Sequence, residues 1–363
     1  MKLPNQKKNY DAHNERVNKY ITAIERIYEK YNLEAAKLAL DLGYSSDAPF
    51  KFSDYPETTQ RLKDIRTQFS QDVSSVIYRG TSDEWMQSNA AQDLLANSVL
   101  KSYDYFYDKK NYLKYYRDNS DALKAFQSRK DKGLNISSKI WNQSKIYSES
   151  LESAISCAIE KGSSAITLSK KISQYLIDFP SLQKDYTDKY GNAAHILDCE
   201  YKSIRLARTE INMAYRSAEQ ARWQQMDFVV GYEVKRSKRE FACKLCESLV
   251  GKYPKDFVFN GWHPSCRCYV IPILKTEEEF WKYDGRSKAT TDSVNEVKDV
   301  PDNFKNWVSE NIKKIDESKK NGTLPYFLKD NQSYIKDDIT SYQESVTKYT
   351  GSYYARINQY LRG

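Results

Sequence analysis

The chain has 363 residues, of which 40% are hydrophobic and 29% are charged, with a net charge of +8 and a mean hydropathy of −0.80. Two or three domains fit this length, and the sequence has no run of 18 apolar residues, so we expect no transmembrane helix and no membrane partner. The N-terminus is basic but has no apolar stretch, so we expect no secretory signal, and hence reduced cysteines. Only 12 glycines and 9 prolines interrupt the chain, which favours long helices.

The N-terminal part of the sequence has the periodicity of helices. Apolar residues recur at steps of three and four over residues 10–42, which predicts a first helix. A second helix is expected from Glu57 to Gly80. Thr81 and Glu84 then match a capping box, with Thr81 as the cap and Glu84 at the third helical position. A third helix is therefore expected to begin there.

The segment Tyr103–Arg117 alternates aromatic residues with lysine and arginine. Such a pattern can stack on the bases of a single nucleic-acid strand. It is also typical of a helix–helix interface in which lysines extend their charged ends into solvent. We favour the interface, because these aromatic residues lie in a helical context.

Further helices are expected in the central part of the chain. One follows the break at Gly133, with Ser137 as its cap, and another begins at Ser163 and ends before Pro180. The stretch 205–225 is rich in good helix formers, and its alanines favour close packing on a neighbour. Polar residues on this helix are predicted either to hold the following module by ion pairs or to lie on a solvated face: Arg208, Glu210 and Arg216.

A cysteine-rich module follows this helix. Strands are expected at 228–236 and 269–273, and between them lie four of the six cysteines and one of the three histidines. Two ligand pairs separated by a loop are the arrangement that a tetrahedral Zn²⁺ site needs. The candidate ligands are Cys243, Cys246, His263, Cys266 and Cys268.

Five donors compete for about four positions in such a site. Cys243 and Cys246 form the safest pair, and Cys266 follows. His263 and Cys268 compete for the last position, and both Cys266 and Cys268 can reach the metal if they lie on one strand and face the same way. A structural zinc is favoured over a catalytic one, because the sequence has no H-E-x-x-H motif and no H-x-E followed by P-C-x-x-C. A disulfide pair and plain buried cysteines are the alternatives.

After this module the sequence is charged and polar, which predicts a linker at 284–300. A last helical unit is expected to start at Pro301-Asp302 and to end at Gly322, followed by a tyrosine-rich tail. The sequence as a whole predicts a mainly α fold, with an elongated multi-helix body and a small zinc-stapled, β-containing module near the C-terminal third. The predicted regions are an N-terminal helical region at 1–130, a central helical region at 131–226, the zinc module at 227–283, the linker at 284–300 and a C-terminal helical and tyrosine-rich region at 301–363.

Several segments resemble the phage Mu F-like family of head morphogenesis proteins. The matching residues are the helical Ala207-Arg208-Thr209-Glu210, the pair Cys243-Lys244-Leu245-Cys246, Gly251-Lys252, and the ending His263-Pro264-Ser265-Cys266-Arg267-Cys268 with Ile271-Pro272-Ile273 after it. The resemblance covers about residues 130–275, and the H-P-x-C-R-C ending is its most specific part. Family members often carry Asp and Thr just before the first cysteine, whereas this chain has Lys238-Arg239-Glu240-Phe241-Ala242.

This resemblance implies a minor head (minor capsid) protein of a tailed phage or prophage, present in the virion near the portal vertex and in the bacterial host cytoplasm during assembly. The implied partners are the portal protein and other head proteins, and a role in DNA packaging or ejection would add phage DNA. About 80 residues follow the module, which is short for a fused enzyme domain, so we expect no enzymatic activity. The alternative is a nucleic-acid-binding protein or nuclease of phage origin that uses the zinc module.

Overall fold

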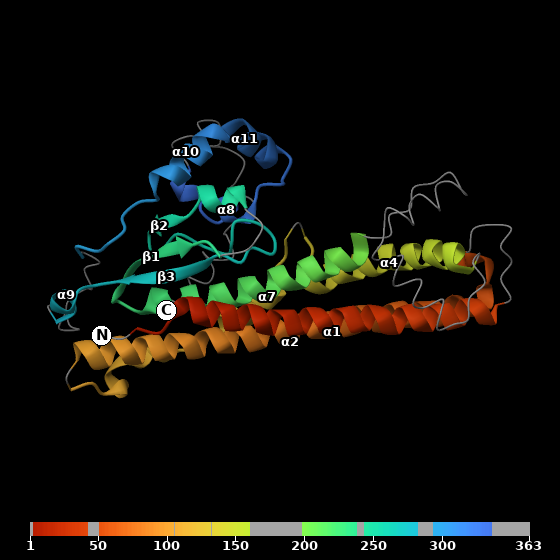
Figure 1. Cartoon of the computed structure of the whole chain (residues 1–363), viewed down its shortest axis with the longest axis horizontal. Coiled ribbons are helices and arrows are strands. Elements are labelled where there is room, and N and C mark those ends of the chain that lie inside the picture. The colour runs from red at the N-terminus through yellow and green to blue at the C-terminus, as the bar shows by residue number, and fades with distance from the viewer. Residues whose placement is uncertain are drawn as a thin grey trace. The chain divides into compact units, whose positions relative to one another are not determined.

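The computed structural model describes residues 3–42, 51–104, 106–131, 133–159, 198–237, 243–281 and 293–335 (Figure 1). The helices in these ranges are α1 (Gln6–Asp41), α2 (Pro56–Tyr103), α3 (Ser120–Ser128), α4 (Ile136–Ile159), α7 (Asp198–Gln225), α8 (Lys244–Ser248), α9 (Glu277–Trp281), α10 (Asp302–Glu310), α11 (Ile312–Lys320) and α12 (Tyr326–Lys329). The 3₁₀ turns are η1 (Phe52–Asp54), η2 (Lys109–Tyr116) and η3 (Gln332–Tyr334). The strands are β1 (Val229–Lys235), β2 (Gly251–Tyr253) and β3 (Tyr269–Leu274).

The prediction of a mainly α fold with a small β-containing module is confirmed. The helix expected from Ser163 to Pro180, most of the linker and the tyrosine-rich tail lie outside the described residues. No helix within the described ranges combines the length and the apolar composition needed to cross a membrane.

The chain forms two compact units, each built from separate stretches of sequence. The first unit contains the described parts of 1–15, 81–126 and 209–363, and the second those of 16–80 and 127–208. The predicted regions are contiguous, whereas each of these units combines segments that are far apart along the chain.

Aromatic rings from three helices fill the core of the second unit. The rings of Tyr28 (α1) and Phe69 (α2) meet edge to face at 4.9 Å, and Tyr147 (α4) stacks on Phe69 at 4.4 Å. The hydroxyl of Tyr147 donates to the side-chain oxygen of Asn32 at 2.6 Å, so its polar end is satisfied within the core. Part of the tyrosine content therefore serves internal packing, because a tyrosine ring can be buried once its hydroxyl finds a partner.

Helix α2 corrects one prediction made from the sequence. A single helix runs from Pro56 to Tyr103 through Gly80, so the capping box predicted at Thr81 and Glu84 is wrong. Both side chains are fully buried, and the Glu84 carboxylate contacts His13 at 2.6 Å. A glycine inside a helix destabilises the helix by about 1 kcal/mol relative to alanine. Burial of the apolar residues along α2 offsets this loss.

Two local expectations in the middle of the chain are also corrected. Residues 109–116 form the 3₁₀ turn η2 instead of continuing a helix, although their rings do pack internally: Tyr112 stacks on Tyr115 at 5.6 Å. Helix α4 is capped by Asn135, whose side-chain oxygen accepts from the Ser138 backbone N–H at 2.8 Å, and not by Ser137.

The first unit contains an antiparallel sheet in the order β2-β1-β3, with α8 beside α10 (Figure 1). Strand β1 has a bulge between Val229 and Gly231. A Cβ added at Gly231 would lie 2.7 Å from the Val297 side chain. The Val297 backbone N–H donates to the carbonyl of Val230 at 3.3 Å. The described end of the predicted linker, 293–300, therefore lies against the sheet, and a side chain at position 231 would displace it.

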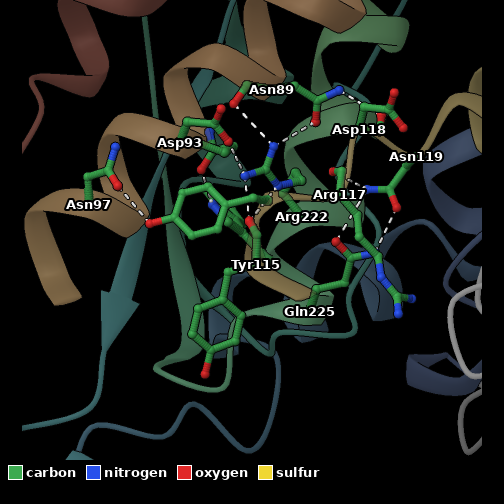
Figure 2. Close-up of polar contacts among 12 residues, drawn as sticks. Asn89, Asp93, Asn97, Tyr115, Arg117, Asp118, Asn119, Arg222 and Gln225 are labelled. Atoms are coloured by element: carbon green, nitrogen blue, oxygen red, sulfur yellow. Dashed lines mark hydrogen bonds and ion pairs between the residues drawn. The ribbon is translucent and has the colours of Figure 1, made fainter. Parts of the chain in front are cut away.

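Buried Arg222 of α7 holds the η2 segment in the first unit (Figure 2). Its Nε atom donates to the backbone carbonyl of Tyr115 at 2.9 Å, and Nη1 donates to the side-chain oxygen of Asn89 at 3.2 Å. Nη2 forms an ion pair with Asp93. The guanidinium thus joins α7, α2 and η2, and only 1% of its side chain is exposed.

We expect Arg222→Met to lower the free energy of unfolding by about 3 kcal/mol, because it leaves the buried carbonyl of Tyr115 without its donor and removes the buried cation that pairs with the half-exposed carboxylate of Asp93. Urea denaturation followed by tryptophan fluorescence measures this loss. The matched control is Arg236→Met, which removes a surface pair with Glu247 and should cost less than about 1 kcal/mol. Equal losses in the two variants would contradict the assigned role.

Candidate metal centre

The C-x2-C pair lies at the start of α8. The Sγ atom of Cys243 accepts from the backbone N–H of Cys246 at 3.4 Å, so Cys243 caps the helix while Cys246 occupies its first turn. This turn brings both sulfurs to one side of the backbone. Cys246 is buried, whereas Cys243 is half-buried.

His263 faces both of these sulfurs. Its Nε2 atom lies 3.3 Å from Cys243 Sγ and 3.2 Å from Cys246 Sγ. Its Nδ1 atom lies 2.8 Å from the carbonyl of Pro264, which can only accept a hydrogen bond. Nδ1 therefore carries the proton, and the lone pair of Nε2 is directed at the two sulfurs, the tautomer found in metal-binding histidines.

The H-P-S-C-R-C sequence turns sharply back toward the same point. The backbone N–H of Cys266 donates to the carbonyl of His263 at 3.1 Å, and Ser265 takes a positive φ of 61°. Cys246, Cys266 and Cys268 place their sulfurs within 4.8 Å of one another, and the first two sulfurs lie 3.9 Å apart. Cys266 and Cys268 precede β3, so they are brought together by the turn and not by a shared strand.

The five predicted donors thus form two groups that share Cys246 and that can hold a metal ion: Cys243, Cys246 and His263, and Cys246, Cys266 and Cys268. Zn–S bonds of about 2.3 Å in a tetrahedron place two sulfurs about 3.8 Å apart, close to the observed 3.9 Å. None of these four cysteines forms a disulfide.

Arg216 of α7 holds the turn through its main chain. It donates to the carbonyls of Asn260 at 3.0 Å, Cys266 at 2.8 Å and Cys268 at 2.8 Å. The sequence predicted that Arg208, Glu210 and Arg216 either hold the module by ion pairs or lie on a solvated face, and Glu210 is buried. Arg216 makes the connection with hydrogen bonds to carbonyl groups, whereas Arg208 donates to Asn18.

The charge of Arg216 also affects the candidate metal site. The residue is 4% exposed and forms no ion pair within the described part of the chain, and an uncompensated buried charge costs several kcal/mol. Burial raises the pKa of nearby Glu219 to about 8, so this carboxyl is largely uncharged at pH 7. Hydrogen bonds with Cys246 and Cys268, helped by Arg216, hold the pKa of Cys266 well below its usual range. Zn²⁺ with three or four thiolates has a net charge of −1 or −2, which would balance the guanidinium.

His13 is a residue whose role the sequence did not reveal. It lies in the first turns of α1 and is 2% exposed, with Nδ1 2.6 Å from Glu84 and Nε2 3.0 Å from the side-chain oxygen of Asn212. The amide nitrogen of Asn212 donates to the carbonyl of Cys266 at 3.2 Å. No local pattern indicates this role, because the two partners of His13 are 71 and 199 residues away.

Comparison of the chain with protein-family models, with curated proteins and with solved structures found no match.

We expect Cys243→Ser and Cys266→Ser to lose bound metal and to unfold the module, because each removes a thiolate donor that couples metal binding to folding. Metal content by mass spectrometry and thermal melting measure these effects. Cys157→Ser and Cys199→Ser are the controls and should keep the wild-type metal content. Full zinc in both donor variants would show that the site is assigned wrongly.

The contribution of Glu219 to stability should fall as pH rises from about 4.5, the ordinary pKa of glutamate, to about 8, the pKa of Glu219 in the folded chain. Over this range the unfolded chain releases the proton while the folded chain keeps it, at about 1.4 kcal/mol per pH unit for one group. Glu219→Gln, which mimics the protonated carboxyl, should flatten this part of the stability profile in urea denaturation at pH 5, 6.5 and 8. The surface replacement Glu310→Gln should leave the slope as in the wild type, and an unchanged slope in Glu219→Gln would contradict the assignment.

Proposed function

We propose that this chain is a minor head protein of a tailed phage or prophage, that it acts in head morphogenesis near the portal, and that it carries a structural Zn²⁺. The proposal rests on the sequence resemblance, and one contact supports it. The hydroxyl of Thr209 accepts from the backbone N–H of Ser265 at 3.0 Å. Thr209 belongs to the A-R-T-E segment and Ser265 to H-P-S-C-R-C, so two matching segments 56 residues apart meet in one site.

The metal's role in this proposal is structural. The candidate donors come from a five-residue helix and a turn, next to a sheet with strands of three to seven residues. Elements this short contribute little stability alone, and a bound zinc adds folding free energy to such a module. Three of the four cysteine donors are buried, which suits a metal that organises the fold.

Exposed apolar side chains in the first unit suit a protein partner. Phe106 is 85% exposed and Leu113 is 62% exposed, on a segment that Arg222 and buried Tyr115 hold in place. Large apolar side chains on a fixed segment are typical of interaction surfaces. In the proposal this surface contacts the portal protein or another head protein.

The proposal is tested by mass spectrometry of DNA-filled heads and of portal-containing particles purified from the encoding phage or induced prophage. We expect this chain at a few copies per head and enriched with the portal. Phage carrying Cys243→Ser should produce heads that lack the chain, because an unfolded module cannot assemble, whereas Cys157→Ser phage should incorporate it normally.

Absence from wild-type particles, with the chain present in infected cells, would contradict the proposal and favour the nucleic-acid-binding alternative. That alternative predicts DNA binding that weakens by roughly a thousandfold or more between 50 and 200 mM salt.

A further inference from the structure

A continuous chain of buried contacts leads from the candidate metal centre to the N-terminal helix within the first unit. The carbonyl of Cys266 accepts from the side chain of Asn212, whose oxygen faces Nε2 of His13, and Nδ1 of His13 faces Glu84. The three distances are 3.2, 3.0 and 2.6 Å, and each of the four residues is 3% exposed or less.

The chemistry of the acceptors fixes the direction of these hydrogen bonds. Because the amide nitrogen of Asn212 donates to Cys266, its oxygen must face His13, and Nε2 of His13 must carry a proton. A contact of 2.6 Å between Nδ1 and Glu84 needs a second proton between those two atoms. Burial lowers the pKa of His13, which favours this proton on Glu84. The pair is then neutral, and each contact in this series joins one donor to one acceptor.

Arg216 supplies a second connection from the same helix. It shares the Cys266 carbonyl with Asn212 and also donates to Cys268. The backbone at position 261 lies close to the guanidinium. A Cβ on Gly261 would lie 2.6 Å from Nη1 of Arg216 and 2.9 Å from Cβ of Cys266, so a side chain does not fit there. The guanidinium is therefore packed directly against the turn that presents the two cysteines.

We infer that Asn212 and Arg216 are positioning residues of the metal centre, and that metal binding is coupled through them to the packing of residues 6–15 of α1. This inference rests on the metal site of the proposed function. The two side chains hold the Cys-Arg-Cys turn by its carbonyls, so they fix the directions of the Cys266 and Cys268 sulfurs. Groups of this kind around a metal site set its affinity by about 10- to 100-fold.

The coupling acts in both directions. A bound metal fixes the turn and supplies the negative charge that balances Arg216, which keeps Asn212 aligned with His13. Without the metal, the module loses folding free energy and the guanidinium lacks its counter-charge, so the contact with His13 and Glu84 weakens. By linkage, a change in the His13 contact alters metal affinity by the same factor as metal alters that contact.

The first measurement uses the wild-type full chain with and without Zn²⁺, removed by a chelator, and follows backbone hydrogen exchange. We expect exchange in residues 6–15 to accelerate at least tenfold when the metal is removed. Residues 109–116 are the internal control, because Arg222 and Asn97 hold that segment in the same unit without contacting the cysteines. Equal acceleration in both segments would mean general unfolding and would overturn the inference.

The second measurement is zinc affinity by chelator competition, with Co²⁺ substitution to report thiolate coordination through its sulfur-to-metal absorption. Asn212→Ala and Arg216→Met should bind Zn²⁺ about tenfold or more weakly, with a shifted Co²⁺ band, and Arg216→Lys should recover part of the loss because it restores the charge. Asn97→Ala removes a polar contact to the hydroxyl of Tyr116 and should leave both readouts unchanged.

The outcomes separate the two claims. A wild-type chain that binds no zinc would overturn the metal site itself. A chain that binds zinc with wild-type affinity in both Asn212→Ala and Arg216→Met would overturn the positioning role alone and leave the metal site intact.

Discussion

The first unit depends on one buried cation. Arg216 donates to three backbone carbonyls of the cysteine-rich module, and two of them belong to Cys266 and Cys268. Every residue has a backbone carbonyl. The contacts of Arg216 therefore depend on the backbone conformation of the turn and not on the identity of its side chains. The same guanidinium needs an anion nearby, and the thiolates it helps to orient are suited to that role. The helix, the turn and the candidate metal donors are thus linked by charge as well as by hydrogen bonds.

Helix α7 is unusual in what it buries. Its alanines and Ile211 are fully buried, yet Asn212, Arg216, Glu219 and Arg222 are also buried and hydrogen-bonded. Hydrogen-bonded polar groups in a core favour one arrangement, because a shift breaks bonds that buried donors and acceptors cannot replace with water. The hydrogen bonds of this helix therefore fix where its neighbours lie. Apolar packing, such as that of Trp223, supplies much of the stability.

The sequence predicted those features that are encoded over short distances. The apolar periodicity of residues 10–42 and the helix-forming composition of residues 205–225 are local signals, so both helices were found, and the cysteine pairs identified the candidate donors. The capping box at Thr81 failed, because a local cap signal was outweighed by burial on both sides of Gly80. His13 was missed because its partners lie 71 and 199 residues away, and no spacing rule connects such positions.

The discontinuous first unit has a consequence for how the chain is made. His13 leaves the ribosome about 250 residues before Cys266, and at roughly 5–20 residues per second this interval is on the order of 10–50 s. For about the first 200 residues of that interval the buried face of the N-terminal helix lacks its α7 partner, and it lacks the cysteine-rich module until the end. The nascent chain therefore exposes an unfinished polar and aromatic surface, on which chaperones can act before the module closes it.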